Sequence, residues 1–171
     1  MKNQSCHNFE LQSIIGDEHQ RLVCLKCGEI NYKNPKIVTG SLILHKNKFL
    51  LCKRAIEPSK GLWTIPAGYL EENETVETGA LREAYEEASA KITIDHLFSI
   101  FSLKKINQIQ IIYLAHLNDD HFAPGIESLD VQLFEYKNLP WNEMAFPSVK
   151  WIFELYKSYK NGDNLPFSRE D

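Results

Sequence analysis

Three glutamates lie close together within a predicted helix, and their spacing suggests chemistry. Residues 75–88 contain no proline and are rich in Glu, Ala, Leu and Arg, a composition that favours a helix. Glu83, Glu86 and Glu87 are three and four residues apart or adjacent, so their carboxylates crowd within one helical turn. Like charges at this spacing repel each other unless water solvates them or a cation binds them.

The acidic helix therefore has two interpretations. It can be a solvated surface, or it can be a site for a hard divalent cation, which reverses the repulsion between the carboxylates. Ligands that are all oxygen atoms favour Mg²⁺ or Mn²⁺ over zinc. The loop before the helix ends at Gly68, a residue that can bring a backbone carbonyl close to such a ligand.

The residues around this helix form a longer pattern that resembles a known signature. The signature of the Nudix hydrolase family is G-x5-E-x7-R-E-U-x-E-E-x-G-U, where U is a hydrophobic residue. Its charged positions and its first glycine match Gly68, Glu74, Arg82, Glu83, Glu86 and Glu87. One position departs, because Ser89 replaces the second glycine, which commonly supplies a left-handed turn at a helix end.

The resemblance implies hydrolysis of a nucleoside diphosphate, linked to another group, at its pyrophosphate. It also implies Mg²⁺ or Mn²⁺ held by Glu83, Glu86 and Glu87 with help from the Gly68 carbonyl. In the same family Arg82 and Glu74 would pair to orient the helix and the loop. The chemistry agrees, because a phosphoanhydride needs its charge neutralised and a water positioned in line, and carboxylate-bound metal ions do both.

The general base is less sharply defined, because family members use different glutamates. Glu86 is the first candidate. The turn-rich segment 123–130 carries Glu127, which can reach the metals as a late ligand or as the base. A solvated loop glutamate is the other interpretation of Glu127.

The first 35 residues differ from the rest and predict a separate zinc-ribbon-like module. Cys24 and Cys27, followed by Gly28, resemble one zinc knuckle, in which the glycine allows a tight turn around the metal. The second C-x2-C pair is missing. A structural Zn²⁺ would need Cys6 and a histidine, His7 or His19; otherwise the module has lost its zinc and kept its shape.

The remaining pattern predicts an α+β domain over residues 36–171, after the turn signal at Asn34 and Pro35. Apolar runs predict a hairpin turning at residues 46–48 and strands over 92–103, 109–117 and 131–136. A last helix is expected to begin at a Ser148 cap and to end at Asn161 and Gly162. The resemblance implies a Nudix-type α/β/α sandwich with a mixed β-sheet.

Composition limits the partners of the protein. The chain has 171 residues, a net charge of -4 and a pI near 5.9, so no overall positive field attracts nucleic acid. No apolar run approaches the length of a membrane span, and the amino terminus lacks the apolar stretch of a signal peptide. We therefore expect a cytoplasmic protein without nucleic-acid or membrane partners, and the resemblance implies a homodimer.

A second resemblance concerns the substrate. The chain is similar to a bacterial and plant-plastid Nudix group whose plant members are FAD pyrophosphatases that accept ADP-ribose. The similarity lies in residues 34–36, 52–58, 125–128, 139–141 and 145–147. It implies FAD or ADP-ribose as substrate. The NADH pyrophosphatases carry S-Q-P-W-P-F-P-x-S after the signature, whereas this chain has FSIFSL over residues 98–103.

Five further residues are open to two interpretations. Trp63, Phe101 and Tyr113 can stack on a flavin or adenine or pack in the core, and packing is the commoner role. Lys53 and Arg54 can meet phosphates or be solvated.

Two alternative functions remain. The first is a regulatory module that binds a nucleotide sugar without hydrolysing it, and the second is a nucleoside triphosphate pyrophosphatase. Modules of the first kind usually lose glutamates of the signature. Because Glu74, Glu83, Glu86 and Glu87 are all present, the sequence favours an enzyme.

Overall fold

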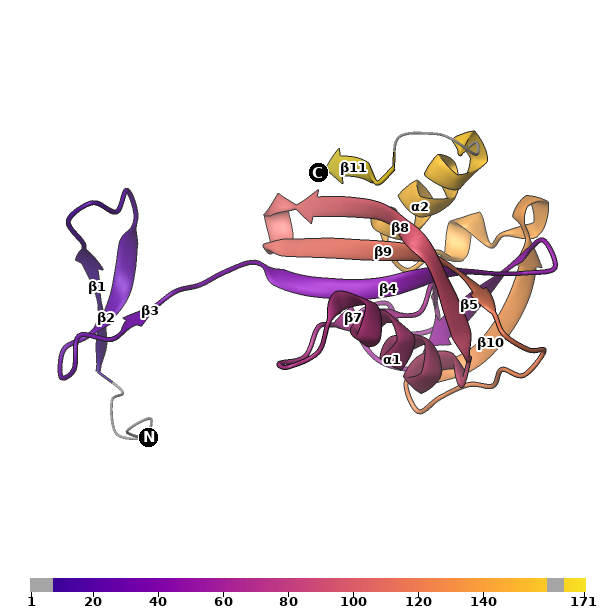
Figure 1. The fold of residues 1–171 in the computed structure, drawn as a ribbon, viewed down its shortest axis with the longest axis horizontal. Helices are drawn as coiled ribbons and strands as arrows, with labels where there is room; N and C mark the ends of the chain where they lie inside the picture. The colour runs from indigo at the N-terminus through magenta and orange to yellow at the C-terminus, as the bar shows by residue number, and fades with distance from the viewer. Residues whose placement is uncertain (1–7, 160–164) are drawn as a thin grey trace. The chain divides into compact units, whose positions relative to one another are not determined.

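The computed structural model describes residues 8–159 and 165–171 and contains two compact units, Met1–Pro35 and Lys36–Asp171 (Figure 1). The predicted zinc ligand Cys6 and the neighbouring His7 lie outside the described residues. The predicted helix stop at Asn161 and Gly162 also lies outside them.

The first unit is a three-stranded antiparallel sheet in the order β1-β2-β3. Its strands are β1 Phe9–Ser13, β2 Gln20–Cys24 and β3 Ile30–Asn31. A tight turn follows β2, in which the Gly28 N–H donates to the Cys24 carbonyl at 2.9 Å and Gly28 has a φ of +72°. Cys24 is buried and Cys27 is exposed on this turn. A zinc site in this unit stays a prediction.

The second unit is built on a mixed eight-stranded sheet with the path β10-β5-β4-β9-β8-β11. Its strands are β4 Lys36–His45, β5 Lys48–Arg54, β6 Trp63–Thr64, β7 Ala67–Tyr69, β8 Ile92–Leu103, β9 Gln108–Leu117, β10 Ser128–Glu135 and β11 Phe167–Glu170. The β4–β9 and β8–β11 pairs are parallel, and the other pairs are antiparallel. Short 3-10 turns are η1 Lys104–Ile106, η2 Tyr136–Asn138 and η3 Trp141–Glu143.

The predicted hairpin and strands are present. The β4–β5 turn consists of Lys46 and Asn47, both with positive φ, which suits the right-handed twist of a two-residue hairpin. The strand predicted over 131–136 begins earlier, at Ser128.

Two helices cover opposite faces of this sheet and give the expected three layers. Helix α1, Val76–Ala88, packs Ala84 and Ala88 on a cluster that includes Ile43 and Leu50. Helix α2, Pro147–Ser158, contributes to a larger cluster on the other face. Its buried hydrophobic residues there are Val149, Ile152 and Phe153. The α/β/α sandwich is therefore confirmed.

The two helix starts differ in how well the sequence predicted them. Thr75 caps α1 by accepting from the Thr78 N–H at 3.1 Å. The predicted Ser148 cap of α2 is wrong, because the cap residue is Phe146 and Ser148 lies buried inside the helix. Pro147 explains the difference, since proline has the φ of a first helical residue and has no N–H to satisfy.

Strand β11 was not predicted. It is four residues long and pairs in parallel with β8 at the sheet edge. Such a short strand has too little alternation to be recognised without its partner.

Across the described ranges 8–159 and 165–171, no helix has the length and apolar character to cross a bilayer.

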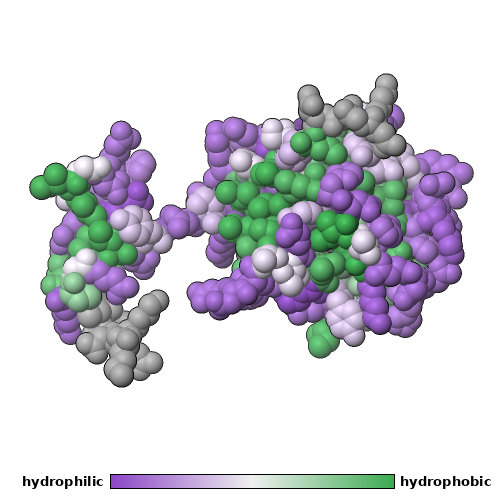
Figure 2. Space-filling model, in the orientation of Figure 1, coloured by the Kyte–Doolittle hydropathy of each residue, from purple (hydrophilic) through white to green (hydrophobic). Residues whose placement is uncertain are grey.

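Helix α1 covers only part of its sheet face. Ile109 and Ile111 on β9 are half-buried, and Ile37 on β4 is exposed. Their register places them on the same side of the sheet as Thr39, whose hydroxyl donates to the Val76 carbonyl of α1. Figure 2 shows hydrophobic residues over β4, β8 and β9 on this face.

Candidate active site

The acidic residues of α1 divide between the interior and the solvent. Glu83 and Glu87 are four residues apart and face inward, with only 8% and 6% of their surface exposed. The side chain of Glu86 is 56% exposed. Burying two carboxylates so close together is unfavourable unless cations or N–H donors compensate them.

Gly68 on β7 lies directly against the Glu83 carboxylate. A Cβ built on Gly68 would lie 2.4 to 2.5 Å from the three carboxyl atoms of Glu83. Only glycine leaves room for the acid here, so the structure brings these two predicted site residues together.

Arg82 connects the loop and the helix through one guanidinium. It donates twice to Glu74, from Nε at 3.1 Å and from Nη2 at 2.8 Å, and Nη2 also donates to the Tyr69 carbonyl at 3.0 Å. Its Nη1 donates to Glu83 at 2.6 Å and to Glu86 at 2.9 Å. Mainly because of the hydrogen bonds from Arg82, the pKa of Glu74 falls to about 2.

The buried carboxylates are difficult to ionise without a cation. Burial, with smaller contributions from Glu83 and Glu127, raises the pKa of Glu87 to about 8. The Ala67 N–H, which donates to Glu87 Oε2 at 3.0 Å, and the charge of Arg54 oppose this shift. Burial also raises the pKa of Glu83, against the influence of Arg82.

The loop glutamate lies near the helix glutamates. Glu127 is exposed, and its charge contributes to the raised pKa values of Glu83 and Glu87. The Ala55 N–H donates to the Glu127 carbonyl at 2.8 Å, which fixes the loop beside the end of β5. The structure therefore brings Glu127 together with the residues of the signature.

The aromatic candidate residues pack in the core, and the two basic candidates lie over aromatic rings. Trp63, Phe101 and Tyr113 are buried, so packing is their role in this structure. Lys53 lies over the Trp63 ring, 5.6 Å from its centroid. The Arg54 guanidinium lies 5.2 Å from the Phe146 ring centroid, and its Nε donates to the Pro58 carbonyl at 2.8 Å.

Some contributors to the site were missed by the sequence reasoning. The Ala67 N–H and the Tyr69 carbonyl are backbone groups, which no residue pattern identifies.

Within residues 8–159 and 165–171, no three His, Cys, Asp or Glu side chains already form a group that could hold a metal.

The comparison with protein families decides the family. Residues 35–159, well over half of the chain, match the NUDIX domain. The chain belongs to the Nudix family.

Relatives of this Nudix protein are found among characterised and solved proteins. An ADP-ribose pyrophosphatase from Methanocaldococcus jannaschii is 30% identical over 77% of this chain and 78% of its own length. A NAD-capped RNA hydrolase from Photobacterium profundum is 24% identical over 68% of this chain and 44% of its own. A crystal structure of a Nudix hydrolase from Nitrosomonas europaea has a TM-score of 0.90 and 39% identity, covering 99% of this chain and 98% of that one.

Proposed function

We propose that this Nudix protein hydrolyses the pyrophosphate bond of a nucleoside diphosphate derivative, with ADP-ribose as the first candidate and FAD as the second. The observation that carries the proposal is the pair of buried carboxylates on α1, Glu83 and Glu87, with Gly68 directly against Glu83. Together with Glu86 on the same helix and Glu127 on the loop, we call them the acidic cluster. The 30% identical ADP-ribose pyrophosphatase supports the choice of ADP-ribose. FAD rests on the second resemblance in the sequence.

The residues of the cluster fit Mg²⁺ or Mn²⁺. Their ligand atoms are carboxylate oxygens, which hard divalent cations prefer. The raised pKa values of Glu83 and Glu87 mark a place where added positive charge is favourable. We assign Glu83, Glu86 and Glu87, with the Gly68 carbonyl, as the groups that hold the cation. When bound, the cation neutralises pyrophosphate charge and lowers the pKa of a bound water.

The remaining residues have separate tasks. Arg82 and Glu74 hold the loop against the helix, and they keep Gly68 beside Glu83. We assign Arg54, whose charge acts on Glu87, to bind a phosphate oxygen of the substrate. Arg82 already binds Glu86 at 2.9 Å, so we assign the proton-accepting role to Glu127 and a ligand role to Glu86.

Product analysis by chromatography tests the activity. The purified protein is incubated with ADP-ribose, FAD, NADH or deoxynucleoside triphosphates, each with Mg²⁺ or Mn²⁺. We expect AMP and ribose 5-phosphate from ADP-ribose. The Glu87→Gln variant should lose about 100-fold or more in rate, because losing a ligand removes several kcal/mol of charge stabilisation.

Two results would contradict the proposal. Preferred cleavage of the triphosphates would identify a nucleoside triphosphate pyrophosphatase instead. No turnover with either metal, together with calorimetric binding of ADP-ribose, would identify a non-hydrolysing sensor. The base is tested separately, since the acid limb of the pH–rate profile should disappear in Glu127→Gln and persist in Glu86→Gln.

A further inference from the structure

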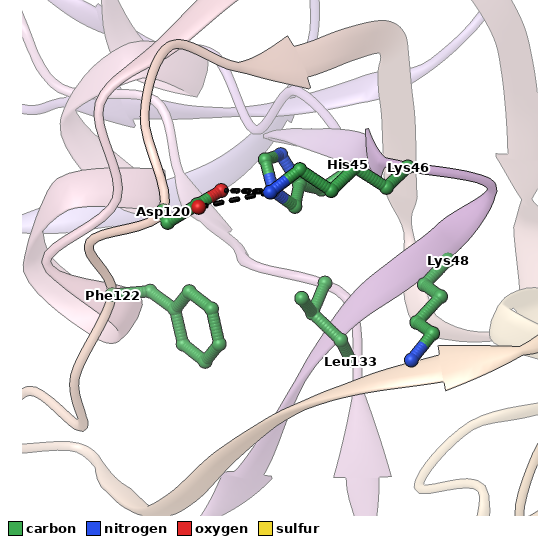
Figure 3. A pocket seen from close by; sticks show the side chains of 6 residues that line it. All are labelled: His45, Lys46, Lys48, Asp120, Phe122 and Leu133. Atoms are coloured by element: carbon green, nitrogen blue, oxygen red, sulfur yellow. Dashed lines mark hydrogen bonds and ion pairs between the residues drawn. The ribbon is translucent and has the colours of Figure 1, made fainter.

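The loop that carries Glu127 joins β9 to β10, and its first residues form ion pairs with the β4–β5 turn. These residues line a cavity of about 220 Å³ (Figure 3). There the Asp120 carboxylate binds both the His45 ring and the Lys46 ammonium, the latter at 2.8 Å. Phe122 follows and packs against the hydrophobic cluster under α1.

The middle of the loop, at Ala123 and Gly125, forms hydrogen bonds with the last turn of α1. The Ala123 N–H donates to the Ala88 carbonyl at 2.8 Å, and the Gly125 N–H donates to the Glu87 carbonyl at 3.0 Å. The last carbonyls of a helix have no partner within the helix, so they are available to a docking backbone. The helix that carries the inner glutamates thus also anchors the loop of Glu127.

Gly125 is the residue that makes this close approach feasible. A Cβ at position 125 would lie 1.7 Å from the Glu86 carbonyl oxygen and 2.8 Å from its carbon. Both atoms belong to the helix backbone, which cannot rotate away as a side chain can. Any residue larger than glycine must therefore lift the loop from the helix.

Lifting the loop would move Glu127. It lies two residues after Gly125, and the N–H of Ser128, the residue after Glu127, donates to the Gly125 carbonyl at 3.1 Å. Its carbonyl is held by the Ala55 N–H, so this segment is attached on both sides.

We propose that Gly125 is a positioning residue, which sets the place of the Glu127 carboxylate by seating the loop on the carboxyl end of α1. The inference rests on the proposed hydrolysis and extends it to a residue outside the signature. One helix then fixes the geometry between the metal-holding glutamates and the glutamate that acts on the water.

A double-mutant cycle in the full chain tests this role. Gly125→Ala should lower kcat by about 100-fold, the typical cost of moving a reacting group by about 1 Å, with a smaller change in KM. Glu127→Gln should lower kcat by about 100-fold or more. The double variant should lie within about threefold of Glu127→Gln, because a misplaced carboxylate that is already absent cannot be lost again. Ile126→Ala, at a fully exposed neighbour, is the matched control and should keep wild-type kcat.

Additive losses, near 10⁴-fold in the double variant, would overturn the inference, as would wild-type kcat in Gly125→Ala. If Gly125→Ala does not fold, amide hydrogen exchange in the wild type replaces the cycle. The Ala123 and Gly125 amides should be protected like those of α1, and free exchange would overturn the docking. An inactive wild type with protected amides would defeat the proposed function and, with it, the positioning role. An active wild type with unprotected amides would defeat this inference alone.

Discussion

The contact between Gly68 and Glu83 connects the backbone of β7 to the acidic helix at the level of single residues. A Cβ on Gly68 would overlap a side-chain carboxylate. A Cβ on Gly40 would instead overlap the Pro66 carbonyl oxygen and the Cα and Cβ atoms of Ala67. A carboxylate can move aside and a backbone cannot. The two glycines should therefore respond differently to the same substitution.

We expect Gly68→Ala to keep the fold and lose activity. Moving the Glu83 carboxylate by about 1 Å should lower kcat/KM by about 100-fold. The free energy of unfolding should change by less than about 1 kcal/mol, or about 2–4 °C in Tm. Gly40→Ala is the comparison, because its Cβ would lie 2.4 Å from the Ala67 Cβ and 2.6 Å from the Pro66 carbonyl oxygen. It should cost about 1–3 kcal/mol of stability. A destabilised Gly68→Ala with normal activity would contradict this assignment.

The end of α1 explains the position at which this chain departs from the Nudix signature. Ser89 is the C-cap residue, with φ 51° and ψ 23°, and its N–H donates to the Tyr85 carbonyl at 2.8 Å. The left-handed turn expected of glycine is therefore made by a serine. The helix keeps its termination at some cost in backbone energy.

Ser89→Gly should stabilise the protein. Removing the side chain relieves about 1–2 kcal/mol of left-handed strain, and the greater freedom of glycine in the unfolded chain offsets about 0.4–1 kcal/mol of it. A net gain of about 0.5–1 kcal/mol should appear in urea unfolding. Ser89→Ala keeps the Cβ, so it should give no gain; an equal gain from alanine would rule out the strain argument.

The Glu74–Arg82 pair joins the loop before α1 to the helix itself, and its contribution to stability should depend on pH. The pKa of Glu74 is about 2 in the folded protein and 4.5 ordinarily, so folding favours the ionised form. The stabilisation is complete above pH 4.5 and is lost as the pH falls toward 2. The free-energy difference between wild type and Glu74→Gln should shrink over this window. A constant difference between pH 6 and pH 3 in urea unfolding would contradict the pairing.

At the scale of the whole molecule, the four glutamates of the proposed active site all belong to the second unit. Both hydrophobic clusters use residues from Leu42 onward, and none of the described residues 8–35 belongs to either. The fold that holds the glutamates therefore has its own core. The homodimer implied by the resemblance stays a prediction.

A chain limited to residues 36–171 should fold cooperatively. Because its two hydrophobic clusters are complete, we expect one thermal transition within about 4 °C of the full chain, equivalent to about 1 kcal/mol. Circular dichroism with a thermal scan measures this. A truncated chain without a cooperative transition would show that the first 35 residues are needed for the core.

The sequence by itself determined the features that depend on neighbouring residues. The spacing of Glu83 and Glu87 fixed their common face, Thr75 provided the helix start, and the polar residues at 46 and 47 provided the hairpin turn. These are local effects, because helix and turn geometry repeat over a few residues. The pairing of Arg82 and Glu74 was implied by the resemblance to the Nudix signature.

Only the tertiary structure decided which distant segments meet. Three features depend on how the sheet and loops close: the edge strand β11, the contact of Gly125 with α1 and the nearness of Glu127 to Glu83. A glycine looks the same in the sequence whether it permits a turn or a close approach. The physical reason is that burial and steric exclusion act through space, between groups that the chain order does not place together.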